Sequence, residues 1–253
     1  MQHSTITRDG IPLIVAGFPR PSTRAAILLI GAGCPFFPVT ILAKLKTIIF
    51  TQLLSKRKNM PSKKTRTPIE PGGTFHIYNR GNNFQDVFFV TDDYLLFLSK
   101  MKQYLSNYCS IYAFALLPNH YHLLIRVNDN LAMNTFSQQF LKFILSYTNK
   151  INFRDKRDGS IFLPNFKRIK IEDEDYLRRL IYYINHNPVK HKVSNDFKSY
   201  KFCSYHILVS EKPTSLARVE ALSYFGGLQS FIEYHNYLNN EEAIKHFTFE
   251  DDI

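Results

Sequence analysis

An apolar run at 110–117 and a two-faced pattern at 121–127 together predict a β-hairpin. Residues 110–117 read as one strand, Pro118 and Asn119 are typical of a turn, and 121–127 read as the second strand. One face of the second strand is apolar and should be core: Tyr121, Leu123, Ile125 and Val127. The other face should be too polar for burial: His120, His122, Leu124 and Arg126.

Apolar periodicity predicts the remaining elements in a simple order. We expect a strand at 74–80, a helix at about 92–106 capped by Thr91 or Asp92, a helix over 136–151, extended pieces at 161–163 and 166–171, and an amphipathic helix that ends near Pro188. Two short helices at 215–222 and 229–237 should follow. The order indicates an α+β fold whose antiparallel sheet carries helices on one face.

Charge points to a nucleic-acid partner, but it is unevenly spread. The formal net charge is +11, and residues 1–70 hold 11 Lys and Arg against 2 acidic residues. Within the rest, residues 142–201 hold 14 basic and 7 acidic residues. The positive field therefore surrounds the amphipathic helix that begins near residue 176.

The first 59 residues have a different character. Residues 25–43 carry no charge over about the length of a membrane span, but Pro35 and Pro38 interrupt them. We therefore expect no membrane partner and interpret 1–59 as an extension, disordered or translated upstream of a true start at Met60. A membrane-tethered structural protein is the alternative. The three cysteines, Cys34, Cys109 and Cys203, lack metal-site spacing and are odd in number, which favours a reducing cytoplasm.

Two short patterns carry candidate chemistry. His120 and His122 lie at i and i+2 on a strand, so both imidazoles face one side and can bind one divalent cation. Two half-exposed surface histidines are the alternative interpretation. Tyr183 and Asn187 lie four residues apart on the helix and can point at the same spot. We expect the uncovered face of the sheet to hold the metal.

Basic residues interleaved with aromatic ones are candidate phosphate contacts beside stacked bases. The alternative is a solvated basic face whose aromatic neighbours lie in the core. The candidates for DNA binding are Arg80, Arg126, Lys150, Arg154, Lys167, Arg168, Lys170 and Lys190.

Five motifs in order resemble the single-tyrosine HUH transposases, and most closely the REP-associated tyrosine transposases. They are FHIYNRG at 75–81, LPNHYHLL at 117–124, GSIF at 159–162, YINHNPVK at 183–190 and FCSY at 202–205. The resemblance covers about residues 74–210. It divides the chain into the extension 1–59, a basic arm 60–73, the HUH domain 74–210 and a helical C-terminal extension 211–253.

The resemblance implies a ferredoxin-like sheet of the HUH endonuclease type and a specific chemistry. Tyr183, rather than Tyr182, would be the nucleophile, with His120, His122 and Asn187 holding Mg or Mn. The implied activity is metal-dependent nicking and strand transfer on single-stranded or hairpin DNA through a 5′-phosphotyrosine, in the cytoplasm, by a homodimer or a monomer. Zinc suits this open histidine and amide set poorly. A DNA or RNA hairpin-binding module without catalysis is the alternative.

Overall fold

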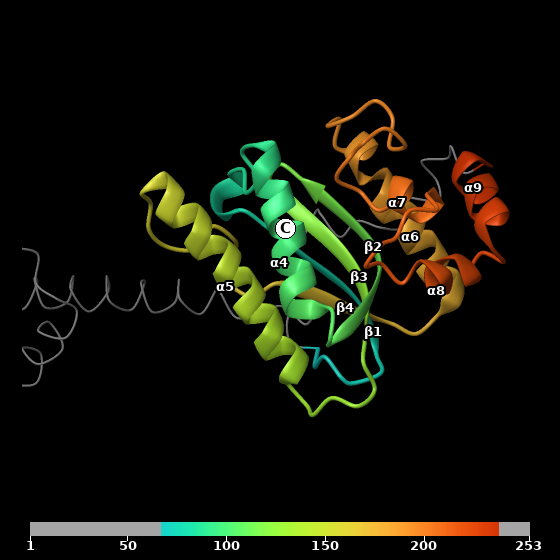
Figure 1. The fold of residues 1–253 in the computed structure, drawn as a ribbon, viewed down its shortest axis with the longest axis horizontal. Helices are drawn as coiled ribbons and strands as arrows, with labels where there is room; N and C mark the ends of the chain where they lie inside the picture. Colours follow the sequence, from blue (N-terminus) through green and yellow to red (C-terminus); the bar gives the residue numbers. More distant parts are fainter. Residues whose placement is uncertain (1–66, 238–253) are drawn as a thin grey trace, which may run out of the picture. The chain divides into compact units, whose positions relative to one another are not determined.

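A four-stranded antiparallel sheet forms the centre of the computed structural model, which describes residues 67–237. The strands are β1 (Thr74–Arg80), β2 (Cys109–Leu117), β3 (His120–Val127) and β4 (Lys167–Ile171), in the spatial order β2-β3-β1-β4. Figure 1 shows this sheet between two groups of helices. The expected hairpin, element order and α+β class are confirmed, and the strand order is that of a ferredoxin-like sheet.

Two long helices cover the apolar face of the sheet. They are α4 (Thr91–Leu105) and α5 (Thr135–Asp155), which pack against each other. Alternation along β3 directs Tyr121 toward them, where its ring lies 5.2 Å from that of Phe97 on α4. Phe97 in turn meets Tyr147 of α5 at 5.2 Å. Large buried rings therefore fill this side of the core, as the alternation of 121–127 predicts.

The opposite face of the sheet is also covered, by α6 (Glu174–Lys190). The expectation that this face is too polar for burial was wrong, because His122 and Leu124 are both 0% exposed. Helix α6 packs mainly on β2 and also reaches β3 and β4. It continues two residues beyond Pro188, further than expected, and Asp173 caps its start by accepting a hydrogen bond from the Tyr176 amide.

The segments after α6 form part of the same fold. Leu116 N–H donates to Phe202 O, and Ser204 N–H donates to Phe114 O, so this segment pairs with the free edge of β2. Three short helices follow: α7 (Tyr205–Val209), α8 (Arg218–Ser223) and α9 (Leu228–Tyr237). The last two match the expected pair, whereas α7 and the 3-10 turn η1 (Asn82–Phe84) were not expected.

No helix among residues 67–237 is long and apolar enough to cross a membrane. The uncharged stretch 25–43, the proposed extension 1–59 and residues 60–66 of the basic arm lie outside the described residues.

A buried carboxylate organises the start of α4. Asp93 is 1% exposed, accepts hydrogen bonds from the amides of Phe89 and Val90, and pairs with Arg154 at the end of α5. The N-cap position is Val90, so neither Thr91 nor Asp92 caps the helix as expected. Asp93 thus acts as the capping residue although it lies within the first turn, and its ion pair with Arg154 connects α4 to α5.

Replacing Asp93 with alanine should lower the free energy of unfolding by about 2 kcal/mol, because two backbone donors and one ion pair lose their acceptor. Urea denaturation of the variant would measure the loss. Asp92→Ala, at an exposed position in the same turn, is the matched control and should change stability by less than about 0.5 kcal/mol. Equal effects from both variants would contradict the assigned role.

Candidate active site

The pairing of β1 with β3 gathers five polar side chains on the face that α6 covers. Tyr78 pairs with His122, and Arg80 pairs with His120. His76 lies two residues from Tyr78, so it shares their face. Since paired residues in an antiparallel sheet project from the same side, the register alone brings the three histidines together.

The three histidine rings are held by specific contacts. His76 Nε2 and His122 Nδ1 are 2.9 Å apart, a hydrogen-bonding distance in which one nitrogen carries the proton. His120 Nδ1 lies 2.7 Å from Asn119 Oδ1, which can only accept the Nδ1 proton. The His120 ring also meets that of His191, just after α6, at 4.6 Å. Each imidazole of the predicted pair is therefore oriented through its Nδ1 atom.

Helix α6 brings Tyr183 and Asn187 against these histidines. The Tyr183 ring lies 5.8 Å from that of His122, nearly perpendicular to it. Asn187, one turn later, donates from Nδ2 to Tyr183 O and is fully buried. Its Oδ1 accepts no hydrogen bond from any residue within 67–237. Tyr182 points elsewhere and stacks on His186 at 3.9 Å, so Tyr183 is the tyrosine that lies beside the histidine pair.

Lys190, a predicted DNA contact, lies beside the Tyr183 hydroxyl. Its Nζ is 3.4 Å from that oxygen and 5.0 Å from the centre of the ring. An ammonium in this position stabilises negative charge that develops on the phenol oxygen. Tyr183 is 0% exposed, so a phosphate can reach it only if neighbouring segments move.

The predicted ligand set fits a metal in its donor chemistry. With Nδ1 of His120 and His122 held by protein partners, each ring would bind a cation through Nε2, and the buried Asn187 Oδ1 would supply an oxygen. Within residues 67–237 no group of three or more His, Cys, Asp or Glu side chains is arranged to hold a metal. A site here thus depends on the amide, which suits a hard ion better than zinc.

Three of the predicted DNA contacts lie on the face of the tyrosine: Arg80, Lys167 and Lys190. Lys167 pairs with Tyr78 in the sheet and so shares its face. The Arg80 guanidinium lies 3.5 Å from the centre of the Phe84 ring. Burial lowers the pKa of Arg80, and its Nε and Nη1 make no hydrogen bond within the described residues. Arg80 therefore retains donors for an anion.

The other predicted contacts lie away from the tyrosine. Arg126 is on the same strand face as His120, but six residues along the strand, about 20 Å away, and it forms a two-point ion pair with Asp129. Lys170 pairs with Glu70 and Glu172, and Arg154 pairs with Asp93 and Asp155. Lys150 is exposed on α5, and Arg168 lies on the face that α5 covers. Neither a position on the same strand face as His120 nor a position in a basic run of the sequence was enough to place a residue beside Tyr183.

Sequence reasoning did not include His76, Asn119 or His191 in the site. A usable signal existed for His191, because it follows Tyr183 and Asn187 at the same four-residue interval. For His76 the sequence offers no such signal, since its contact with His122 requires the register between segments 46 residues apart. The position of Asn119 predicts only a turn residue, and not its contact with His120.

The far side of α6 is fixed by a chain of buried hydrogen bonds. Phe114 N–H donates to Ser204 Oγ, which donates to Asn185 Oδ1, and Asn185 Nδ2 donates to His235 Nε2 on α9. His235 completes the chain through Nδ1 to Phe231 O, which makes it a neutral imidazole with one proton. This chain connects β2, α6 and α9, and so positions the helix that carries Tyr183.

Comparison with known proteins gives an informative structural match. A solved REP-associated tyrosine transposase bound to a REP hairpin superposes with a TM-score of 0.51 and 22% sequence identity, over 62% of this chain and 92% of the other. The fold is that of a tyrosine transposase. A bacterial tRNA(His) guanylyltransferase-like protein in complex with GTP matches with a TM-score of 0.36 and 10% identity, over 60% and 79% of the two chains, which is too low to support an argument. No family model and no curated protein matches the sequence.

Acid should destabilise this transposase fold through the two buried histidines on the far side of α6. Burial lowers the pKa of His186 to about 4 and that of His235 to about 3. The unfolded chain binds these protons near pH 6.5, so the stabilisation is complete above that pH and is lost as pH falls toward 4. Thermal melts between pH 7.5 and 4.5 would show the decline.

The matched variant is His186→Phe, which preserves the stacking on Tyr182 and Phe197 and removes one titrating group. Its melting temperature should fall less steeply over the same pH range than that of the wild type. Identical slopes in the two proteins would mean that His186 does not contribute to acid sensitivity.

Proposed function

We propose that this protein is a transposase that nicks and rejoins DNA through a covalent bond to Tyr183. The observation that carries the proposal is the position of Tyr183, beside His122, with Lys190 Nζ at its hydroxyl and the open acceptor of Asn187 one turn away. This combination provides a nucleophile, a cation to stabilise it and a ligand set for a metal. The shared fold with a REP-associated tyrosine transposase supports the same class.

The proposed reaction exchanges one phosphate ester for another. The Tyr183 hydroxyl loses its proton and attacks the scissile phosphorus, a bond forms from the phenol oxygen to phosphorus, and the bond to the 3′ oxygen breaks. The 3′ oxygen leaves and takes up a proton, which yields a 5′-phosphotyrosine and a free 3′ hydroxyl. Because the ester energy is retained, a second 3′ hydroxyl can attack the same phosphorus and release Tyr183, joining a new strand without ATP.

The surrounding residues have separate roles in this proposal. Lys190 stabilises the phenolate, and Arg80 directs its available donors at the phosphate. Asn119 and His76 orient His120 and His122, which with Asn187 would hold magnesium or manganese. When bound, that ion supplies charge neutralisation and polarises the phosphate.

The proposed substrate is single-stranded DNA that folds into hairpins. The structural neighbour was solved with a REP hairpin, and the described part of this chain has basic residues on both sides of the β4 edge. A binding module without catalysis is the second candidate, and the complete burial of Tyr183 favours it.

Tyr183→Phe should abolish covalent attachment to DNA while preserving hairpin binding, because only the nucleophilic oxygen is removed. Denaturing gels of protein incubated with hairpin oligonucleotides and manganese would show the adduct. Tyr182→Phe is the matched control, since Tyr182 stacks away from the histidines, and it should form the adduct normally. Hairpin binding with no adduct from the wild type would favour the binding module, and an adduct that persists in Tyr183→Phe would reject Tyr183 as the nucleophile.

Lys190→Met should slow adduct formation by roughly 100-fold and leave hairpin affinity nearly unchanged, because the ammonium acts on charge that develops at the phenol oxygen during the reaction. Single-turnover cleavage rates would measure this. Lys192→Met, at an exposed lysine two residues away, serves as the control for lost positive charge. If both variants weaken binding equally and leave the rate intact, Lys190 is a DNA contact, as its sequence pattern suggested.

A further inference from the structure

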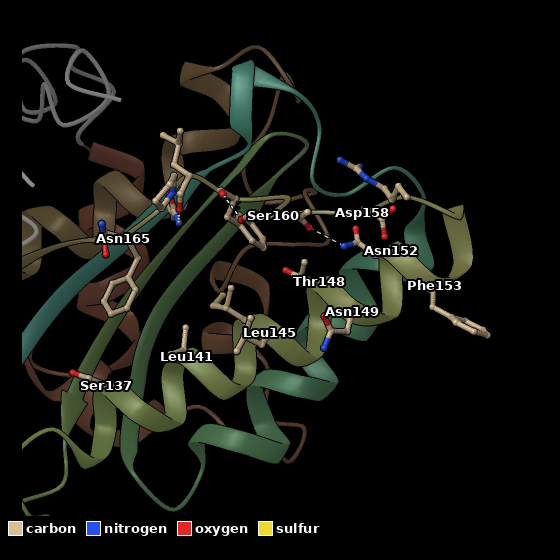
Figure 2. Close-up of a pocket in the computed structure, with 18 of the residues that line it drawn as sticks. Ser137, Leu141, Leu145, Thr148, Asn149, Asn152, Phe153, Asp158, Ser160 and Asn165 are labelled. Carbon is tan, nitrogen blue, oxygen red and sulfur yellow. Dashed lines mark hydrogen bonds between the residues drawn. The ribbon is translucent and has the colours of Figure 1, made fainter. Parts of the chain in front are cut away.

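A second candidate binding site lies on the other side of the sheet from Tyr183. A groove of about 1450 Å³ runs between α5 and the segment 158–168. Figure 2 shows Leu141, Leu145 and Asn149 along α5, opposite Ser160 and Asn165 of that segment. The volume exceeds that of an ordinary small-molecule pocket, which favours an extended ligand.

Apolar and aromatic surface is available along the groove. Leu141 is 56% exposed and Leu145 is 48% exposed, and they stack at a four-residue interval on the same side of α5. Phe153, two turns further along, is 85% exposed. Across the groove Phe166 is held in place by Phe140, with ring centres 4.5 Å apart, and the Arg168 guanidinium lies over its ring at 5.2 Å. These are flat or apolar surfaces on which bases can stack.

Side-chain amides line the same groove. Asn152 donates from Nδ2 to Gly159 O, while its buried Oδ1 accepts no hydrogen bond from residues 67–237. The side chains of Asn149 and Asn165 also form no hydrogen bond within that range. An amide offers a donor and an acceptor side by side, which matches the edges of unpaired bases.

The charge of the groove favours an anionic occupant. Lys156, Arg157 and Arg168 line it and form no ion pair within the described residues, against a single acidic residue, Asp158. This balance disfavours the chain's own arm at 61–66, which contains Lys63, Lys64 and Arg66. Stacking surfaces, amides and excess positive charge together match a single strand of nucleic acid.

The edge strand β4 connects the groove to the candidate active site. Lys167 pairs with Tyr78 and so projects to the face of the tyrosine, whereas Arg168 pairs with Ile77 and projects to the groove. Beyond β4 the sheet has no further strand among the described residues. Two consecutive cations thus flank a free edge, around which a phosphate backbone can pass.

We propose that this groove binds unpaired nucleotides of the same DNA strand whose phosphodiester reaches Tyr183, so that the strand bends around the β4 edge. This inference rests on the proposed function, since it specifies the part of the substrate that lies outside the hairpin. It assigns recognition of the unpaired flank to α5 and the segment 158–168, separate from the chemistry.

The test measures affinity in the full chain carrying Tyr183→Phe, so that it does not depend on cleavage. Fluorescence anisotropy would compare a hairpin with an unpaired flank against the same hairpin with a blunt end. Leu145→Glu places a negative charge in the groove and should weaken binding of the flanked hairpin about tenfold, with no change for the blunt one. Leu95→Glu on α4, at a leucine of similar exposure outside the groove, should change neither.

Equal affinity of Leu145→Glu and its parent for the flanked hairpin would overturn the groove assignment, even if the wild type forms adducts. Conversely, a flank-specific loss in Leu145→Glu would support the groove even if no adduct is ever detected, and so the two proposals fail separately. A photoreactive 5-iodouracil in the flank should crosslink to peptides from α5 that contain Phe153. Crosslinks confined to other elements would also overturn the assignment.

Discussion

The register between β1 and β3 is the constraint on which the candidate site depends. It sets Tyr78 opposite His122 and Arg80 opposite His120, and it places Phe75 and Ile77 on the side of α4 and α5. A slip of one residue would send the histidines into the aromatic core and the aromatic residues to α6. The large rings that pack against α4 therefore hold the register, and the register in turn holds the polar side chains together.

Helix α6 carries out two tasks on two faces. One face presents Tyr183 and Asn187 to the sheet, and the other places Asn185 and His186 against the segments that follow. The Ser204, Asn185 and His235 hydrogen bonds fix its rotation about its own axis, which determines which of two adjacent tyrosines meets His122. The C-terminal segments are thus part of the scaffold that positions the tyrosine.

Local periodicity was sufficient to predict the strands and the longer helices, but not the surfaces through which they pack against one another. The two-residue alternation of 121–127 correctly predicted the face of β3 that packs in the core beneath α4 and α5, although the opposite face proved to be buried too, and the helical period of 176–188 predicted most of α6. Periodicity could not show that α6 folds back over the histidine face, because an apolar stripe on a helix indicates that the stripe is buried but not which element it packs against. A shared strand face likewise did not place Arg126 near His120, because Arg126 lies at the far end of the strand and pairs with Asp129. The contact of His76 with His122 was missed because it joins two separate strands. The metal set and the nucleophile stay predictions.

Full burial of Tyr183 has a consequence for the fate of a covalent intermediate. If the segments that must move to admit a phosphate close again over a phosphotyrosine, bulk water has little access to its phosphorus, so spontaneous hydrolysis competes poorly with attack by an incoming strand end. The same packing that slows entry of the substrate would then favour ligation over loss of the intermediate as a permanent break. A phosphotyrosine ester shielded in this way would hold the DNA end in a form that can still be ligated, and the end would not be released by hydrolysis.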